Sequence, residues 1–309
     1  MNSFLIYSFY RFKKINKLKK LKKDLDTHFK NKLVKGTILL ANEGINASIS
    51  GDQKTLDGAL KYIKKKLKIR KLNLKINDTE FLPFNRMKVR LKKEIVSLGI
   101  KNLKLNNRKA NYIHPSEWDK IILNKNIKVI DVRNTYEIKI GKFKNTINPI
   151  TSTFRQFPDK IKNLNLSKEE TLAIYCTGGI RCEKASIHLN KIGYKNILQL
   201  EGGVLNYLEY KKKFENTRTW SGDCFVFDDR VSVNKKLKKG RFNQCYGCRR
   251  PITKKDMSSN FYIKGVYCPY CYNRKSQDKI KSSLTRQDQI EKAKENNTFS
   301  SFIKVGKDF

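Results

Sequence analysis

Acidic residues are scarce in this sequence of 309 residues. It contains 28 Asp and Glu against 68 Lys and Arg, which leaves a formal net charge of +40. Such an excess favours a polyanionic partner over an acidic small molecule, because lysine and arginine displace counterions from a phosphate backbone. A genome biased towards AT-rich codons would also raise the lysine content. Charge alone does not distinguish RNA, DNA and a solvated surface.

Long apolar runs and cofactor motifs are also lacking, and histidines are few. No apolar run approaches the roughly 18 residues of a membrane span, so no membrane contact is predicted. In residues 1–12 the apolar segment precedes the basic residues, the reverse of a signal peptide, so we expect a first strand in a cytoplasmic protein. The only histidines, His28, His114 and His188, are scattered and form no iron triad. With no Walker loop and no dinucleotide fingerprint, no organic cofactor is predicted.

The sequence has seven cysteines, an odd number that argues against a secreted disulfide framework. Four of them form two CxxC pairs. This usage indicates metal or redox chemistry in a reducing compartment. The spacing is typical of a zinc ribbon, in which four thiolates complete a closed tetrahedral site. We therefore predict structural zinc in a zinc-ribbon-like segment over 217–275, against the alternative of four reduced cysteines without metal. The ligands would be Cys245, Cys248, Cys268 and Cys271.

The first hundred residues alternate between strand and helix patterns. Apolar spacing predicts strands at 4–10, within 35–50, at 72–76 and at 87–96, and amphipathic helices at 18–29 and 55–67. The order β-α-β-β-α-β predicts a ferredoxin-like (acylphosphatase-like) domain over 1–100. The turn from Asn42 to Asn46 is either ordinary turn chemistry or part of a functional site.

After a polar linker at 101–111, residues 112–216 form a second predicted domain. Apolar runs at 128–132, 171–175 and 196–200 are separated by helical patterns, which predicts an α/β fold with a parallel sheet covered on both faces. Sites in such folds form at the carboxyl ends of strands, where Asp131 and Cys176 lie. Residues 276–309 are a polar tail with one helix predicted at 286–294.

Cys176 ends a buried strand and enters a glycine-containing loop before a helix predicted at 183–192. Backbone N–H groups at a helix N-terminus lower a thiol's pKa, so this cysteine is predicted to be a reactive nucleophile rather than a core residue. Arg181 would add a fixed positive charge or pair with an acidic side chain. The loop residues between them are Thr177, Gly178, Gly179 and Ile180.

These features resemble the rhodanese family, whose order of motifs this chain reproduces over about 100 residues. The shared stretches are Asp131-Val-Arg133, Tyr136-Glu137, 141–149, the Cys176 loop and Glu201-Gly-Gly203. Related phosphatases have a longer loop that holds a tetrahedral phosphate, whereas four residues between Cys176 and Arg181 suit a sulfur atom carried on the cysteine. Asp131 and Arg133 are expected to brace the loop. Cys182 is either a redox partner or a small apolar residue.

The whole chain resembles the bacterial tRNA uridine(34) hydroxylase family. The shared stretches are 36–46, 154–157, 176–186, 220–233 and the double CxxC. The resemblance implies oxygen-dependent 5-hydroxylation of the wobble uridine of tRNA, with molecular oxygen as co-substrate and Cys176 as the essential residue. It further implies that the anticodon region binds the basic surface.

Two alternatives stay open, because no oxygen-activating centre is evident in the residues. One is a sulfurtransferase that carries a persulfide on Cys176 for tRNA thiolation. The other is a non-catalytic RNA-binding rhodanese scaffold, which an intact nucleophile loop disfavours. Asn42, Glu43 and Asn46 are expected to contribute to the pocket across a domain interface.

Overall fold

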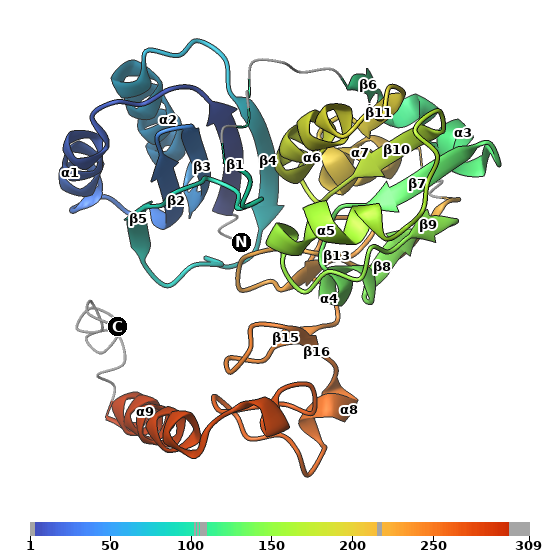
Figure 1. Ribbon diagram of the computed structural model, residues 1–309. Coiled ribbons are helices and arrows are strands. Elements are labelled where there is room, and N and C mark those ends of the chain that lie inside the picture. The colour runs from blue at the N-terminus through green and yellow to red at the C-terminus, as the bar shows by residue number, and fades with distance from the viewer. Residues whose placement is uncertain (1–3, 102, 104, 106–109, 215–217, 297–309) are drawn as a thin grey trace.

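The computed structural model describes residues 4–101, 103, 105, 110–214 and 218–296. An N-terminal α+β domain and a central α/β domain lie side by side, and a smaller C-terminal part extends from them (Figure 1). Among the described residues, no helix is both long and apolar enough to cross a membrane. Of the predicted linker, residues 102, 104 and 106–109 lie outside the described residues, as do residues 297–309 of the predicted tail.

The N-terminal domain is a five-stranded sheet with two helices on one face, which confirms the predicted ferredoxin-like fold. The strand order is β4-β1-β3-β2-β5, antiparallel except for the β2–β5 pair. The elements are β1 Phe4–Phe12, α1 Leu18–Phe29, β2 Lys35–Ala41, β3 Gly44–Gly51, α2 Gln53–Leu67, β4 Asn73–Thr79 and β5 Met87–Leu91.

Side chains of these strands alternate between an apolar face and a polar face. Phe9 of β1 and Ile38 of β2 lie in the core beneath α1 and α2, whose buried residues include Leu25 and Leu60. The helices lie on the side of the sheet away from the central domain (Figure 1). In the described part of the chain, the other face carries no helix of this domain and is turned towards the central domain.

The central domain has five parallel strands in the order β6-β11-β10-β7-β9. Its strands are β6 Asn111–Ile113, β7 Ile127–Asp131, β9 Thr146–Ile147, β10 Thr171–Tyr175 and β11 Ile197–Leu200. Its helices are α3 Pro115–Leu123, α4 Thr135–Ile138, α5 Phe157–Lys162, α6 Ile180–Lys191 and α7 Gly203–Lys212, with the short 3-10 turn η1 at Phe154–Gln156.

Separate apolar cores cover the two faces of this sheet, which confirms the predicted parallel sheet with helices on both sides. Trp118 of α3 packs with Tyr207 of α7 on one face. Phe157 of α5 packs with Leu189 of α6 on the other. Because the sheet is buried on both faces, its strands are continuously apolar rather than alternating.

The C-terminal part consists of short two-stranded pairs and three short or exposed helical segments. β12 Trp220–Gly222 pairs with β8 Gly141–Phe143 of the central domain, β13 Cys224–Phe225 pairs with β14 Ser232–Val233, and β15 Asn243–Gln244 pairs with β16 Pro251–Ile252. The helical segments are α8 Lys254–Met257, η2 Tyr272–Arg274 and α9 Gln277–Glu295. The helix predicted at 286–294 thus begins nine residues earlier, at Gln277, because an exposed polar helix carries no apolar stripe that marks its start.

Candidate active site

Cys176 lies directly after β10, and the loop that follows it turns back into α6. The turn requires a glycine, because Gly179 has a φ of 94° just before the helix begins at Ile180. The helix predicted from residue 183 therefore starts three residues earlier. The backbone N–H of Gly179 donates a hydrogen bond of 3.1 Å to Cys176 Sγ.

The surroundings of Cys176 favour its thiolate. Burial by itself raises the thiol pKa, but hydrogen bonds from the Cys182 side chain and from backbone N–H groups, together with the Arg181 charge, outweigh it and lower the pKa to about 6. Cys182 behaves in the opposite way. Burial and the neighbouring Cys176 raise its pKa well above the usual range, so it stays a thiol that donates to Cys176.

Arg181 is held by a glutamate that the sequence analysis did not assign to the site. Its Nη1 and Nη2 donate to Oε1 and Oε2 of Glu137 at 2.6 and 2.7 Å, and Nη2 also reaches Thr177 Oγ1 at 3.1 Å. Glu137 is fully buried. Burial raises its pKa, yet Arg181 more than offsets this and lowers it. Both expectations for Arg181 are therefore met, because it pairs with an acidic side chain while its charge still lowers the pKa of Cys176.

Glu137 could have been found from local sequence. It lies three residues after Asn134, and this spacing is typical of a helix-capping box. Its Oε1 accepts a hydrogen bond of 3.1 Å from the Asn134 backbone N–H at the start of α4. The same carboxylate thus begins a helix and holds Arg181 in place.

Asp131 and Arg133 form a second buried ion pair at the end of β7. Arg133 Nε donates to Asp131 Oδ1 at 2.9 Å, and Nη2 donates to Oδ2 at 2.6 Å and to the Gly141 carbonyl at 2.7 Å. The guanidinium also lies over the rings of Tyr175 and Trp220, at 5.5 and 5.2 Å from their centroids. The pair therefore connects β7, β8 and the residue before Cys176, and neither member lines the cavity described next.

A cavity of about 470 Å³ separates the Cys176 loop from the N-terminal sheet. Its floor is formed by the loop, with Cys176, Thr177, Gly178, Ile180 and Arg181. Its opposite wall comes from the helix-free face of the sheet, including Ser8, Tyr10, Asn46, Ser48, Asn73, Lys75 and Asn77. Phe227, Asp228 and Arg230 line its side, and the Phe227 side chain is 64% exposed.

The expected contribution of the Asn42–Asn46 turn is only partly seen. Asn46 lines the cavity, although its Nδ2 donates to the Ile95 carbonyl at 3.1 Å. Glu43 lies instead in the domain interface, where its Oε2 is 2.8 Å from Nζ of the buried Lys184. Asn42 is exposed and does not line the cavity. Asn42 and Glu43 lie in the turn between β2 and β3, whereas Asn46 lies within β3, whose helix-free face borders the cavity.

The β4 wall was missed by the sequence analysis, although a signal for it exists. Asn73, Lys75 and Asn77 alternate at a period of two along β4, which places them on one face of the strand. In the sheet, Asn73 is paired with Tyr10 and Lys75 with Ser8 of β1. Nothing in the local pattern shows that this face meets the Cys176 loop.

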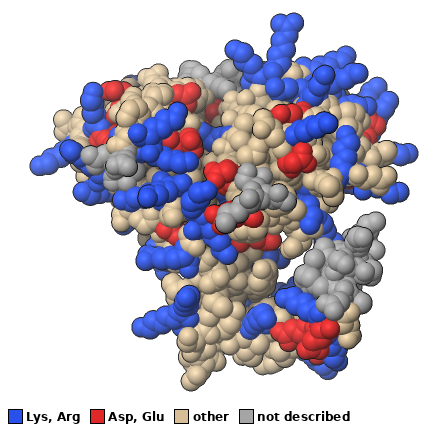
Figure 2. Space-filling view, turned by 180° about the vertical axis from the view of Figure 1, so that it is seen from behind, with Lys and Arg blue, Asp and Glu red and all other residues tan. Residues whose placement is uncertain are grey.

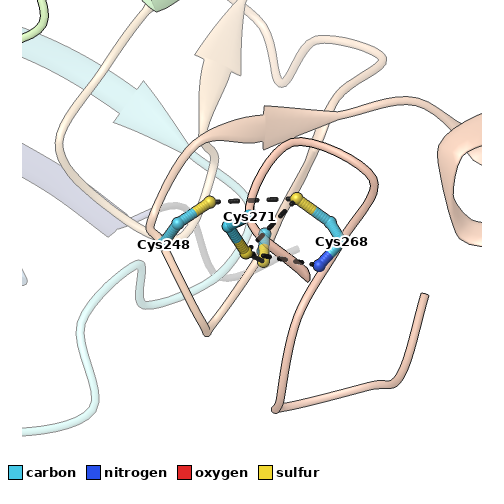
Figure 3. Close-up of side chains that lie close together, drawn as sticks. Cys248, Cys268 and Cys271 are labelled. Atoms are coloured by element: carbon cyan, nitrogen blue, oxygen red, sulfur yellow. Dashed lines mark hydrogen bonds between the residues drawn. The ribbon is translucent and has the colours of Figure 1, made fainter. Parts of the chain in front are cut away.

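The four CxxC cysteines come together at one point in the C-terminal part. Their sulfur atoms all lie within 4.8 Å of one another. Individual Sγ–Sγ distances are 3.8 Å for Cys248–Cys268, 3.9 Å for Cys268–Cys271 and 4.0 Å for Cys245–Cys271 (Figure 3). Four thiolates bound tetrahedrally to zinc at about 2.3 Å lie about 3.8 Å apart, so the geometry fits. The cluster could bind a metal ion such as zinc, and such a closed site leaves no position for a substrate.

The parallel sheet and the Cys176 loop define a rhodanese-like domain. In agreement, the model of the rhodanese-like domain matches residues 114–210. Residues 4–95 match the UPF0176 acylphosphatase-like domain. This combination confirms the resemblance to the bacterial tRNA uridine hydroxylase family, and the chain has the domains of a rhodanese-like sulfurtransferase or tRNA-modifying family.

Several solved structures are similar to about a third of this chain. A rhodanese-related protein from Thermoplasma volcanium is 29% identical, with 32% of this chain and 92% of that chain covered and a TM-score of 0.27. A rhodanese-like domain protein from Staphylococcus aureus is 26% identical, with 31% and 90% covered and a TM-score of 0.28. A polysulfide-sulfur transferase from Wolinella succinogenes is 26% identical, with 35% and 80% covered and a TM-score of 0.29.

Proposed function

We propose that the protein hydroxylates C5 of the wobble uridine (position 34) of tRNA in an oxygen-dependent reaction, with Cys176 as the nucleophile. One atom of O2 replaces the C5 hydrogen, and the other leaves as water with two electrons from an external reductant. The observation that carries this proposal is the cavity in which the Cys176 loop faces the polar sheet face of the N-terminal domain. A free rhodanese-type loop needs no such wall to accept a sulfur atom. A wall of amide and hydroxyl side chains suits a substrate with many hydrogen-bonding groups, such as a nucleoside.

The charge of the molecule supports a tRNA partner. On the face seen in Figure 2, lysine and arginine side chains are widespread, while acidic side chains are fewer and gather in small groups. Contacts between such basic side chains and phosphates would position an RNA without reading its sequence. An unstacked base from the anticodon loop would enter the cavity, because sequence-specific RNA recognition targets single-stranded bases that can be turned out.

The loop itself supports a covalent role for Cys176. A thiolate, held by the Gly179 N–H and the Cys182 thiol, is both the nucleophilic form and the form that carries a sulfane sulfur. A purely structural scaffold does not require a depressed thiol pKa. For the same reason the second candidate function is sulfur transfer through a Cys176 persulfide for tRNA thiolation.

Nucleoside analysis of cellular tRNA by mass spectrometry separates these functions. A deletion strain is complemented with the wild-type chain, with Cys176→Ala or with Cys224→Ala as a matched buried-cysteine control. Hydroxylation is supported if the deletion and Cys176→Ala strains lose 5-hydroxyuridine-derived nucleosides while the wild-type and Cys224→Ala strains keep them. Loss of thiolated nucleosides instead supports sulfur transfer. Normal modification in the Cys176→Ala strain would contradict any catalytic role for this loop.

A further inference from the structure

Three cations line the cavity, and two of them are already neutralised. Arg181 is paired with Glu137. Arg230 donates from Nε and Nη2 to Asp228 at 2.9 and 2.7 Å. Lys75 is the third, and within the described part of the chain no hydrogen bond or ion pair engages its ammonium group. A negative charge that a ligand brings into this cavity would therefore meet one unpaired cation among the described residues.

Lys75 reaches the cavity from the N-terminal domain and lies beside the Cys176 loop. A Cβ on Gly202 would be 2.5 Å from its Nζ, so the ammonium group packs directly on that glycine. Gly202 in turn lies against the loop, because its Cα would be 3.6 Å from a Cβ on Gly179. The lysine thus contacts the turn before α7 at the point where that turn meets the nucleophile loop.

Lys75 is half-buried at the cavity, which withdraws its ammonium group partly from water. An ammonium group removed from water without a partner is disfavoured, and burial accordingly lowers its pKa to about 8. The charges of Glu201 and Glu209 oppose this fall without forming an ion pair with it. A bound anion would restore the missing partner, whereas a neutral base would not.

We propose that Lys75 binds the backbone phosphate next to the target nucleotide, so that the N-terminal domain positions the nucleotide over Cys176. This inference rests on the proposed function, because a nucleotide turned into the cavity brings a flanking phosphate with it. Asn73 and Asn77 lie on the same face of β4 and would meet the sugar and base. The lysine is a substrate-binding residue that the N-terminal domain contributes to the site of the rhodanese-like domain in the same chain.

The test measures binding of an anticodon stem–loop RNA to the full chain by fluorescence anisotropy over a series of salt concentrations. Lys75→Met should weaken binding roughly tenfold, as expected for loss of a hydrogen bond to a charged group. It should also reduce the slope of log K against log salt by about 0.7, the contribution of one phosphate contact on a single strand. Lys61→Met, on the far side of the sheet in α2, is the matched control and should change neither.

A second arm identifies the phosphate. Neutral methylphosphonates are placed 5′ or 3′ of the wobble uridine. One of them should weaken binding to the wild type as much as Lys75→Met does, and it should add nothing further in that variant. Thermal unfolding serves as the folding control, and Lys75→Met should be at least as stable as the wild type because an unpaired ammonium is removed.

Unchanged affinity and slope in Lys75→Met, additive losses in the methylphosphonate arm, or no binding by the wild type would each overturn the proposal. If Lys75→Met instead raised only the KM for thiosulfate in sulfur transfer, the anion would be a sulfur donor and the RNA assignment would be wrong. Because binding is measured without turnover, these outcomes are distinct from failure of the hydroxylase proposal, which the Cys176→Ala nucleosides report.

Discussion

Replacing Cys176 by alanine should change how the stability of the protein depends on pH. The folded protein lowers the pKa of this thiol from an ordinary 9.0 to about 6. Between these values the unfolded chain holds a proton that the folded chain has lost, so stability rises with pH. The contribution is complete above the unfolded value and disappears as the pH falls through about 6.

The size of the effect follows from the two pKa values. Each tenfold change in proton concentration is worth about 1.4 kcal/mol, so the interval from 9.0 to about 6 amounts to about 4 kcal/mol. At pH 7 about 1.4 kcal/mol of this should be present. Relative to Cys176→Ala, the wild type should therefore gain about 1.4 kcal/mol per pH unit between about pH 6 and pH 9.

Urea unfolding of both proteins at a series of pH values measures this difference. The titrations of all other groups are shared and largely cancel. Cys224→Ala is the matched control, because burial raises the pKa of that thiol from 9.0 to about 12. Both its folded and unfolded forms are then protonated below about pH 9, so its difference curve should be flat there. Parallel wild-type and Cys176→Ala curves across this range would refute the thiolate.

Three further perturbations test other parts of the structure. Glu137→Gln leaves the buried Arg181 without its partner and should lower the free energy of unfolding in urea by about 3–5 kcal/mol. The pKa of Cys176 should fall further. An unchanged free energy of unfolding and an unchanged Cys176 pKa would contradict the pairing. Lys184→Met leaves Glu43 and Glu94 facing each other and should separate the unfolding of the two domains in calorimetry, whereas a single unshifted transition would speak against this contact. Cys248→Ser should abolish metal binding, measured as zinc per chain, and expose the C-terminal part to proteolysis without altering the Cys176 titration; retained metal would exclude the four-thiolate site.

Much of the fold could be predicted because the spacing of apolar residues along the chain indicates each strand and helix. The alternation of β1 to β3 and the apolar stripes of α1 and α2 identify the N-terminal sheet, and the continuous apolar runs of β7, β10 and β11 identify a buried parallel sheet. Helix starts were less accurate. α6 begins inside the glycine loop, where the turn at Gly179 rather than an apolar stripe determines its first residue.

The sequence predicted only those residues of the candidate site that lie close together along the chain. Cys176 and Arg181 belong to one loop, so their spacing alone indicates a reactive thiol. Glu137 is 44 residues from Arg181, and only its capping position hinted at it. Lys75 is separated from the loop by about 100 residues and by a domain boundary, and lysine is too common in this chain to be noticed.

The sequence by itself determined a nucleophilic cysteine in a sulfur-sized loop, four cysteines spaced for a metal, and a basic chain. These are properties of neighbouring residues, whose geometry is set by short stretches of backbone. The tertiary structure alone decided that Glu137 neutralises Arg181 and that the polar face of the N-terminal sheet forms the wall opposite Cys176. It also decided that, among the described residues, Lys75 is the cation left unpaired in that cavity. Pairing and desolvation depend on which distant surfaces meet, and that follows from the packing of the two domains rather than from any local pattern.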